Sequence, residues 1–94
     1  MKVTIADKEL DIQQMAETLI EEKLGEREAA LIQRIKEQII VTDKSISFTL
    51  PGANTEWSLA VLETVCELCK FLRSKNVRAC IRHSHAFERI ALFV

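Results

Sequence analysis

Residues 56–74 are the stretch that most limits the folds open to this chain. Apolar side chains recur there at helical spacing and cover more than half of the helix circumference. The centre of this arc is formed by Val61, Val65, Leu68, Cys69 and Leu72, and it is widened by Leu59, Leu62, Cys66 and Phe71. A helix this apolar must be covered on more than one side. The sequence therefore predicts a sheet beneath it and a second helix or subunit beside it.

Alternating segments on both sides of this helix predict the strands of the sheet. Over residues 45–50 the apolar residues Ile46, Phe48 and Leu50 alternate with Ser and Thr, which indicates a strand with one buried and one polar face. Residues 77–82 and 87–94 alternate in a similar way. The four residues between them, 83–86, predict a β-hairpin loop. In this register Arg82 lies opposite Phe87.

The order of these elements predicts how the strands are arranged. A strand, a helix and two further strands imply a right-handed crossover from 45–50 to 77–82. The last segment is the most apolar, as a central strand should be, so we place 87–94 between the other two and antiparallel to both. The predicted class is α/β (α+β), with a small mixed sheet in split β-α-β order. The sheet has three strands, or four if residues 2–5 join it, and helix 56–74 covers one face.

Residues 9–41 predict an N-terminal helical region that Gly25 interrupts. Glycine is unfavourable inside a helix but is favoured just after its end. Two helices, about 9–24 and 27–41, and one long kinked helix both fit the pattern. Asp7 or Asp11 is the expected N-cap of this region, and Asn54 or Thr55 that of helix 56–74.

This helical region is expected to pack on the free face of the sheet or to reach into a partner subunit. A chain of 94 residues predicts one domain, 1–94, with a core small enough that oligomer formation would supplement it. We therefore predict a homodimer. The candidate self-association residues are Leu24, Leu31 and Ile35.

Composition and motifs narrow the functional class. No run of about 18 apolar residues predicts a membrane span, and the first ten residues lack the apolar segment of a secretory signal. Three cysteines, an odd number, then favour reduced thiols and a cytoplasmic location. No phosphate-binding glycine loop or nucleophile motif is found. We expect no enzyme activity, no catalytic residue, no cofactor and no membrane partner.

Charge is distributed unevenly along the chain. Residues 1–44 carry 7 basic and 10 acidic side chains, whereas residues 45–94 carry 6 basic and 4 acidic ones. Arginines and aromatic residues alternate on the sheet face turned away from helix 56–74. The candidate partner-binding residues are Arg78, Arg82, Phe87, Arg89, Phe93, His83 and His85. Such a surface suits an acidic protein or a single-stranded nucleic acid. It is equally compatible with coverage by the N-terminal helices, whose glutamates would pair with the arginines, or with a dimer interface.

The cysteines raise the alternative of a zinc site. Cys66 and Cys69 are spaced like a ligand pair, as are Cys80 and His83, with His85 nearby. Strand alternation, however, directs Cys80 to the sheet face away from Cys69. We therefore interpret the thiols as buried or half-buried packing residues, the histidines as solvated loop residues, and predict no metal site.

The leading functional prediction is a small non-enzymatic protein-interaction or regulatory module that self-associates and meets an acidic partner. The first alternative is a nucleic-acid-binding protein that uses the basic and aromatic residues of 78–93. The second alternative is a zinc-stabilised adaptor.

Overall fold

A four-stranded antiparallel sheet forms one layer of the computed structural model, which describes residues 1–51 and 55–94. Its strands are β3 (Ile40–Val41), β4 (Ser45–Thr49), β5 (Cys80–Ser84) and β6 (Arg89–Phe93), in the order β3-β4-β6-β5. The predicted α/β class with a small sheet is confirmed, and β6 lies between β4 and β5, antiparallel to both. Two details differ. Every neighbouring pair in this sheet is antiparallel, and its fourth strand is β3 instead of residues 2–5.

Helix α3 (Glu56–Ser74) has the predicted bounds, because local signals mark both of its ends. At the start, the Thr55 hydroxyl accepts a hydrogen bond from the Ser58 backbone N–H at 3.0 Å. The alternative cap, Asn54, lies outside the described residues. At the end, Asn76 adopts a left-handed φ of 63°, and the Val77 N–H donates to the Leu72 carbonyl at 3.0 Å. This is a Schellman motif, which stops the helix and returns the chain toward the sheet.

The N-terminal helical region consists of two helices, as one of the two sequence interpretations predicted. Helix α1 (Ile12–Leu24) begins at Asp11, whose carboxylate accepts from the Gln14 N–H at 3.2 Å. It ends at Gly25, which has a φ of 76°. A short 3-10 helix, η1 (Glu26–Glu28), leads into α2 (Ala29–Glu37). Both helices are shorter than predicted, because β2 (Lys8–Asp11) pairs with β1 (Lys2–Ile5) in a separate hairpin and residues 40–41 form β3.

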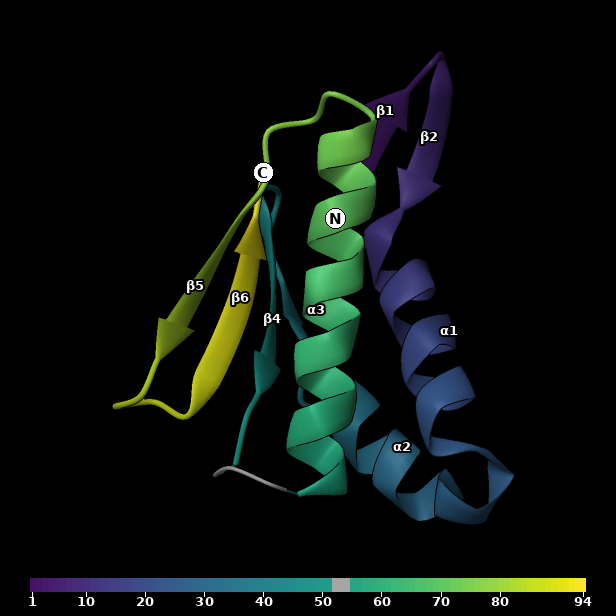
Figure 1. The fold of residues 1–94 in the computed structure, drawn as a ribbon, viewed down its shortest axis with the longest axis vertical. Helices are drawn as coiled ribbons and strands as arrows, with labels where there is room; N and C mark the ends of the chain where they lie inside the picture. The colour runs from purple at the N-terminus through teal and green to yellow at the C-terminus, as the bar shows by residue number, and fades with distance from the viewer. Residues whose placement is uncertain (52–54) are drawn as a thin grey trace.

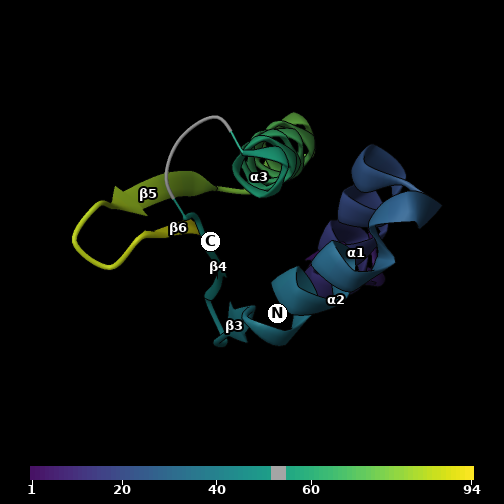
Figure 2. The same cartoon turned by 90° about the horizontal axis from the view of Figure 1, so that it is seen from below.

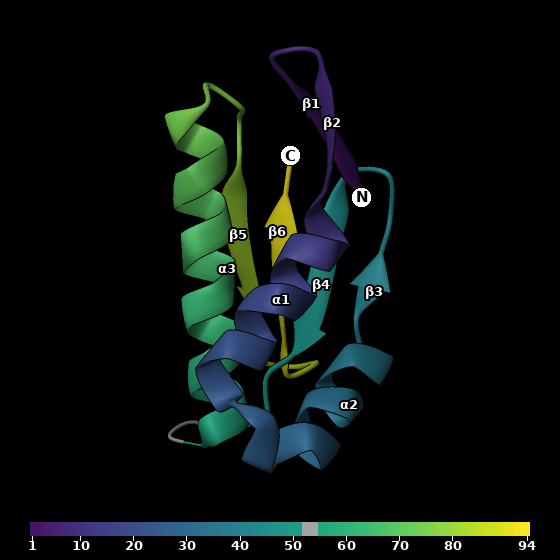
Figure 3. The same cartoon turned by 90° about the vertical axis from the view of Figure 1, so that its right-hand side faces the viewer.

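The helices α1, α2 and α3 lie on the same side of the four-stranded sheet (Figure 1, Figure 2 and Figure 3). The expectation that the N-terminal region covers the other face of the sheet is therefore wrong, whereas its alternative, that the region reaches into a partner subunit, stays a prediction. Instead, α1 is the neighbour that the wide apolar arc of α3 requires. The ammonium group of Lys23 on α1 joins the two helices through ion pairs with Glu67 at 2.9 Å and Glu63 at 3.5 Å.

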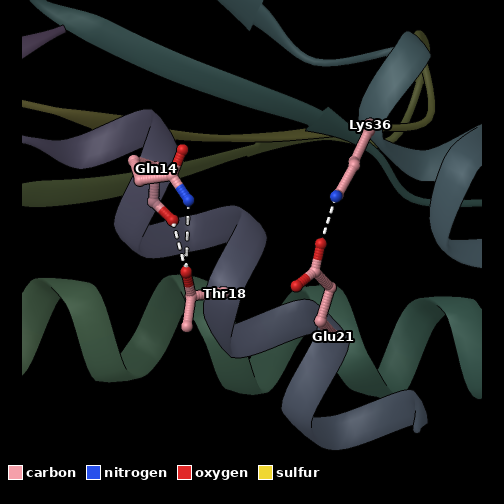
Figure 4. Close-up of polar contacts among 4 residues, drawn as sticks. All are labelled: Gln14, Thr18, Glu21 and Lys36. Carbon is pink, nitrogen blue, oxygen red and sulfur yellow. Dashed lines mark hydrogen bonds and ion pairs between the residues drawn. The ribbon is translucent and has the colours of Figure 1, made fainter. Parts of the chain in front are cut away.

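Helix α2 is joined to α1 in turn. An ion pair links Lys36 on α2 with Glu21 on α1, next to the turn of α1 in which the Thr18 hydroxyl donates to the Gln14 carbonyl (Figure 4).

Among the described residues, no helix is long and apolar enough to cross a membrane.

The core lies between the helices and the inner face of the sheet. Its largest fully buried side chains include Phe48, Ile12, Ile20, Ile35, Ile46, Leu68, Leu72 and Leu92. Ile35 is only 1% exposed and is therefore inaccessible to a second copy, so the sequence prediction is corrected for this residue. Leu24 and Leu31 are half-buried and pack against the core.

The β5–β6 hairpin has a different loop from the predicted one. Arg82 pairs with Ala91, and Ser84 pairs with Arg89, so the loop is residues 85–88. The predicted pairing of Arg82 with Phe87 is wrong by four positions. Phe87 lies in the loop instead and is 78% exposed. Because the shift is an even number of residues, each side chain keeps its predicted face.

Candidate functional site

The outer face of the sheet, defined as the side turned away from the helices, is the first candidate surface. Directly opposed residues of antiparallel strands share a face, and Ile46, Ile90 and Leu92 are buried beneath the helices. The outer face therefore consists of Ile40, Ser45, Ser47, Thr49, Cys80, Arg82, Ser84, Arg89, Ala91 and Phe93. Among the described residues, this face holds two arginines and no Asp or Glu.

Arg82 is the accessible cation of this face. Its guanidinium carbon lies 5.2 Å from the centroid of the Phe93 ring, which is a cation–π contact. The ion pairs found among the described residues involve lysines, namely Lys2, Lys23 and Lys36. Arg82 is exposed, and it can donate to a carboxylate or phosphate of a partner.

Arg89 has a different role, because its hydrogen bonds are made inside the molecule. Its Nη1 donates to the Thr49 hydroxyl at 3.0 Å, its Nε donates to the Ser47 hydroxyl at 3.3 Å, and its Nη2 donates to the Gln38 carbonyl at 2.9 Å. Burial lowers the pKa of Arg89 from its ordinary value. The side chain thus ties β6 to β4 and to the end of α2.

More basic residues lie along the strand at the edge of the sheet. Arg78 is exposed just before β5, and Arg73 on α3 donates from Nε to the Ala79 carbonyl at 2.9 Å. The His83 and His85 rings are also brought together, with centroids 4.1 Å apart. They do not join the outer face, because His83 pairs with Ile90 and so lies on the inner side.

The three thiols occupy separate environments. Cys69 is buried, with its sulfur 3.8 Å from the Ala79 carbonyl oxygen, whereas Cys66 is exposed on α3. Cys80 is exposed and pairs with Phe93 on the outer face, which confirms the direction predicted from strand alternation. Within the described ranges, no group of three or more His, Cys, Asp or Glu side chains is placed to hold a metal ion.

A shallow groove between α1 and α3 is a feature that the sequence did not predict. Leu24, Leu59 and Ala60 supply its apolar lining, and Lys23 and Glu63 are among its charged residues. Its charges are of both signs, and they lie on the helical side of the molecule. The sequence feature that relates to this groove is the width of the apolar arc of α3. Leu59 lies at the edge of that arc and is exposed in the structure.

Comparisons with protein-family models, with curated proteins and with solved structures give no match to this chain. In the part of the chain that the structure describes, the candidate site combines a sheet face that no helix covers, exposed arginines and no acidic residue on that face.

Proposed function

We propose that this chain is a small non-enzymatic protein-binding module that recognises an acidic protein partner through the outer face of its sheet. The observation that carries this proposal is the charge of that face, where no acidic residue of the described strands lies beside Arg82 or Arg89. The glutamates that pair with Lys23 lie on the helical side of the molecule. An acidic partner therefore supplies the charge complementarity that the outer face lacks.

Arg82 is the central contact in this proposal. Because Arg89 uses its N–H groups within the fold, it contributes mainly long-range positive potential. Arg82 and Arg78 are exposed and can form short, charge-assisted hydrogen bonds with carboxylates. Arginine is also among the residues that dominate binding energy at protein interfaces.

Single-stranded nucleic acid is the second candidate, because Arg82 lies over Phe93 and Phe87 is exposed beside this surface. Sheets that read RNA stack two or three bases on exposed aromatic rings. The outer face offers one aromatic ring, that of half-buried Phe93 beneath Arg82. The geometry therefore favours a protein partner.

Self-association and the cytoplasmic location stay predictions from sequence. With Ile35 excluded, Leu24 and Leu31 remain the predicted self-association residues, and the exposed Leu59 lies beside Leu24 in the groove. A zinc-stabilised adaptor is not proposed, because Cys69 and Cys80 lie on opposite sides of the sheet layer.

Arg82→Glu is expected to weaken the binding of an acidic peptide at least about tenfold, since a hydrogen bond to a charged group contributes about 1.5–3 kcal/mol. The probe is a fluorescein-labelled ten-residue peptide of alternating Glu and Val, and binding is measured by fluorescence anisotropy. Arg27→Glu makes the same charge change on η1, away from the sheet, and should change affinity less than about twofold.

Two outcomes contradict the proposal. Equal losses for Arg82→Glu and Arg27→Glu would mean that net charge alone drives binding. Strong, salt-dependent binding of a labelled oligothymidylate, without binding of the peptide, would replace the protein partner by nucleic acid.

A further inference from the structure

The two edges of the four-stranded sheet differ in length. On one side β3 ends the sheet with only two paired residues, Ile40 and Val41. On the other side β5 presents five residues, 80–84, in a continuous register with β6. A long, regular edge strand presents main-chain N–H and C=O groups to which another strand can pair. Among the described residues, β5 is therefore the open edge of this sheet.

Hydrogen bonds of β6 identify which main-chain groups of β5 face outward. The Val94 N–H donates to the Lys44 carbonyl at 2.8 Å, and the Leu50 N–H donates to the Glu88 carbonyl. Because antiparallel bonds alternate along a strand, the even-numbered residues of β6 bond to β4 and the odd-numbered ones to β5. Through the register, Arg82 then bonds to β6, whereas Ile81 and His83 direct their N–H and C=O groups away from the sheet.

The side chains along this edge form a cationic side and an apolar side. On the outer face, Arg82 is exposed, and Arg78 is exposed just before the strand. On the inner face, Ile81 is 37% exposed. Leu62 on α3 is equally exposed and lies two helical turns before Cys69, on the helix face that approaches β5. A strand with acidic residues on one face and apolar residues on the other complements both sides.

We propose that β5 receives an extended acidic segment of the partner as a fifth, antiparallel strand, an inference that rests on the proposed function. The segment places carboxylates opposite Arg82 on the outer face. Its apolar residues lie opposite Ile81 and His83 and exchange main-chain hydrogen bonds with them, since directly opposed residues share a face. Strand addition of this kind takes its affinity from the main chain and its specificity from alternate side chains.

A second copy of this chain is a poorer occupant of the edge. Two-fold pairing of β5 centred on Arg82 opposes that residue to itself, and pairing centred on Cys80 opposes Arg78 to Arg82. Like charges directly opposite one another destabilise a strand pair. Pairing centred on Ile81 opposes Arg82 to Cys80, but it still places Arg78 and Arg82 of both copies on the same face of the seam. An acidic strand instead neutralises the two arginines that it meets.

His83→Pro tests the main-chain part of this proposal. Proline removes an N–H that points outward and leaves the hydrogen bonds between β5 and β6 in place, as edge strands permit. His83→Ala is the matched control, because it removes the imidazole and keeps the N–H. We expect His83→Pro to weaken binding of the Glu–Val peptide at least about tenfold and His83→Ala to change it less than about twofold.

A second comparison uses the unaltered chain, so it is decisive whether or not His83→Pro folds. An alternating Glu–Pro peptide has the same carboxylates, but its prolines lack the N–H groups that would bond to Ile81 and His83. It should bind at least about tenfold more weakly than the Glu–Val peptide.

The possible outcomes distinguish strand addition to β5 from the proposed recognition of an acidic partner. If Arg82→Glu abolishes binding while His83→Pro and the Glu–Pro peptide bind normally, an acidic partner stands and strand addition is overturned. If the wild-type chain does not bind the Glu–Val peptide, both are overturned. A wild-type dimer in sedimentation analysis that His83→Pro dissociates would make a second copy the occupant and overturn the acidic strand.

Discussion

Replacing Ile35 with Asp is expected to unfold the chain, not to release a folded monomer from a dimer. Ile35 is 1% exposed on the inner face of α2 and belongs to the core. The substitution removes about 1.5–3 kcal/mol of apolar burial and places a carboxylate where it has no partner, which costs several kcal/mol more. A small domain is stable by only about 5–15 kcal/mol, so the loss takes up most or all of that margin. Urea titration followed by circular dichroism measures it.

Ala30→Asp is the matched control for this prediction. It introduces the same side chain in the first part of α2, where residue 30 is exposed. A carboxylate near a helix N-terminus is tolerated or mildly favourable, so the unfolding free energy should change by less than about 0.5 kcal/mol. A folded, monomeric Ile35→Asp protein, compared with a dimeric wild type, would return Ile35 to the self-association surface.

Arg89→Ala is expected to lower the free energy of unfolding by about 2–3 kcal/mol, because hydrogen bonds to a charged group contribute about 1.5–3 kcal/mol. The guanidinium reaches Ser47, Thr49 and Gln38 together, which ties β6 to β4 and to the end of α2. Arg89→Lys should recover little of this loss, since an ammonium group cannot reproduce the planar arrangement of donors. Differential scanning calorimetry provides the readout.

Arg82→Ala is the comparison that separates structural from binding arginines. Arg82 makes an exposed cation–π contact with Phe93, which contributes about 0.5–1 kcal/mol. Its loss should affect stability far less than that of Arg89, and binding far more. Equal destabilisation by the two alanine variants would contradict this division of roles.

The elements predicted correctly from sequence are those whose signals are local. Helix α3 matched its predicted bounds because Thr55 supplies a cap at its start and its apolar spacing runs without a break. The central position of β6 followed from its apolar residues on both faces. The hairpin register did not, because alternation identifies only odd and even positions. Its loop depends on Glu88, a residue with a left-handed φ of 48° that the sequence does not signal.

In the N-terminal half, too, features with a local sequence signal were predicted and features set by long-range contacts were not. Gly25 predicted the break between α1 and α2, but no local pattern indicates which face of the sheet an amphipathic helix covers. Long-range contacts such as those of Lys23 with Glu63 and Glu67 show the face that is used. The β1–β2 hairpin was missed because Ala6 and Asp7 occupy its left-handed turn positions, where glycine or asparagine is the usual signal.

The candidate site was predictable only in part. Alternation placed Arg82, Arg89 and Phe93 on one face correctly, and it turned Cys80 away from Cys69. The internal role of Arg89 depends on which hydroxyls of β4 lie across from it, and that information is contained in the register. The open main-chain edge at Ile81 and His83 requires the strand order and the hydrogen-bond alternation together.

The central claim is that β5 is an open edge whose outer side carries Arg82, and amide hydrogen exchange tests it most directly. In the free protein, labelled with nitrogen-15 and followed by NMR, the Ile81 and His83 amides should exchange at least about tenfold faster than the Arg82 amide, which is bonded to β6. Adding the Glu–Val peptide should then slow exchange at Ile81 and His83. Protection of Ile81 and His83 in the free chain, with rapid exchange at Arg82, would contradict the account.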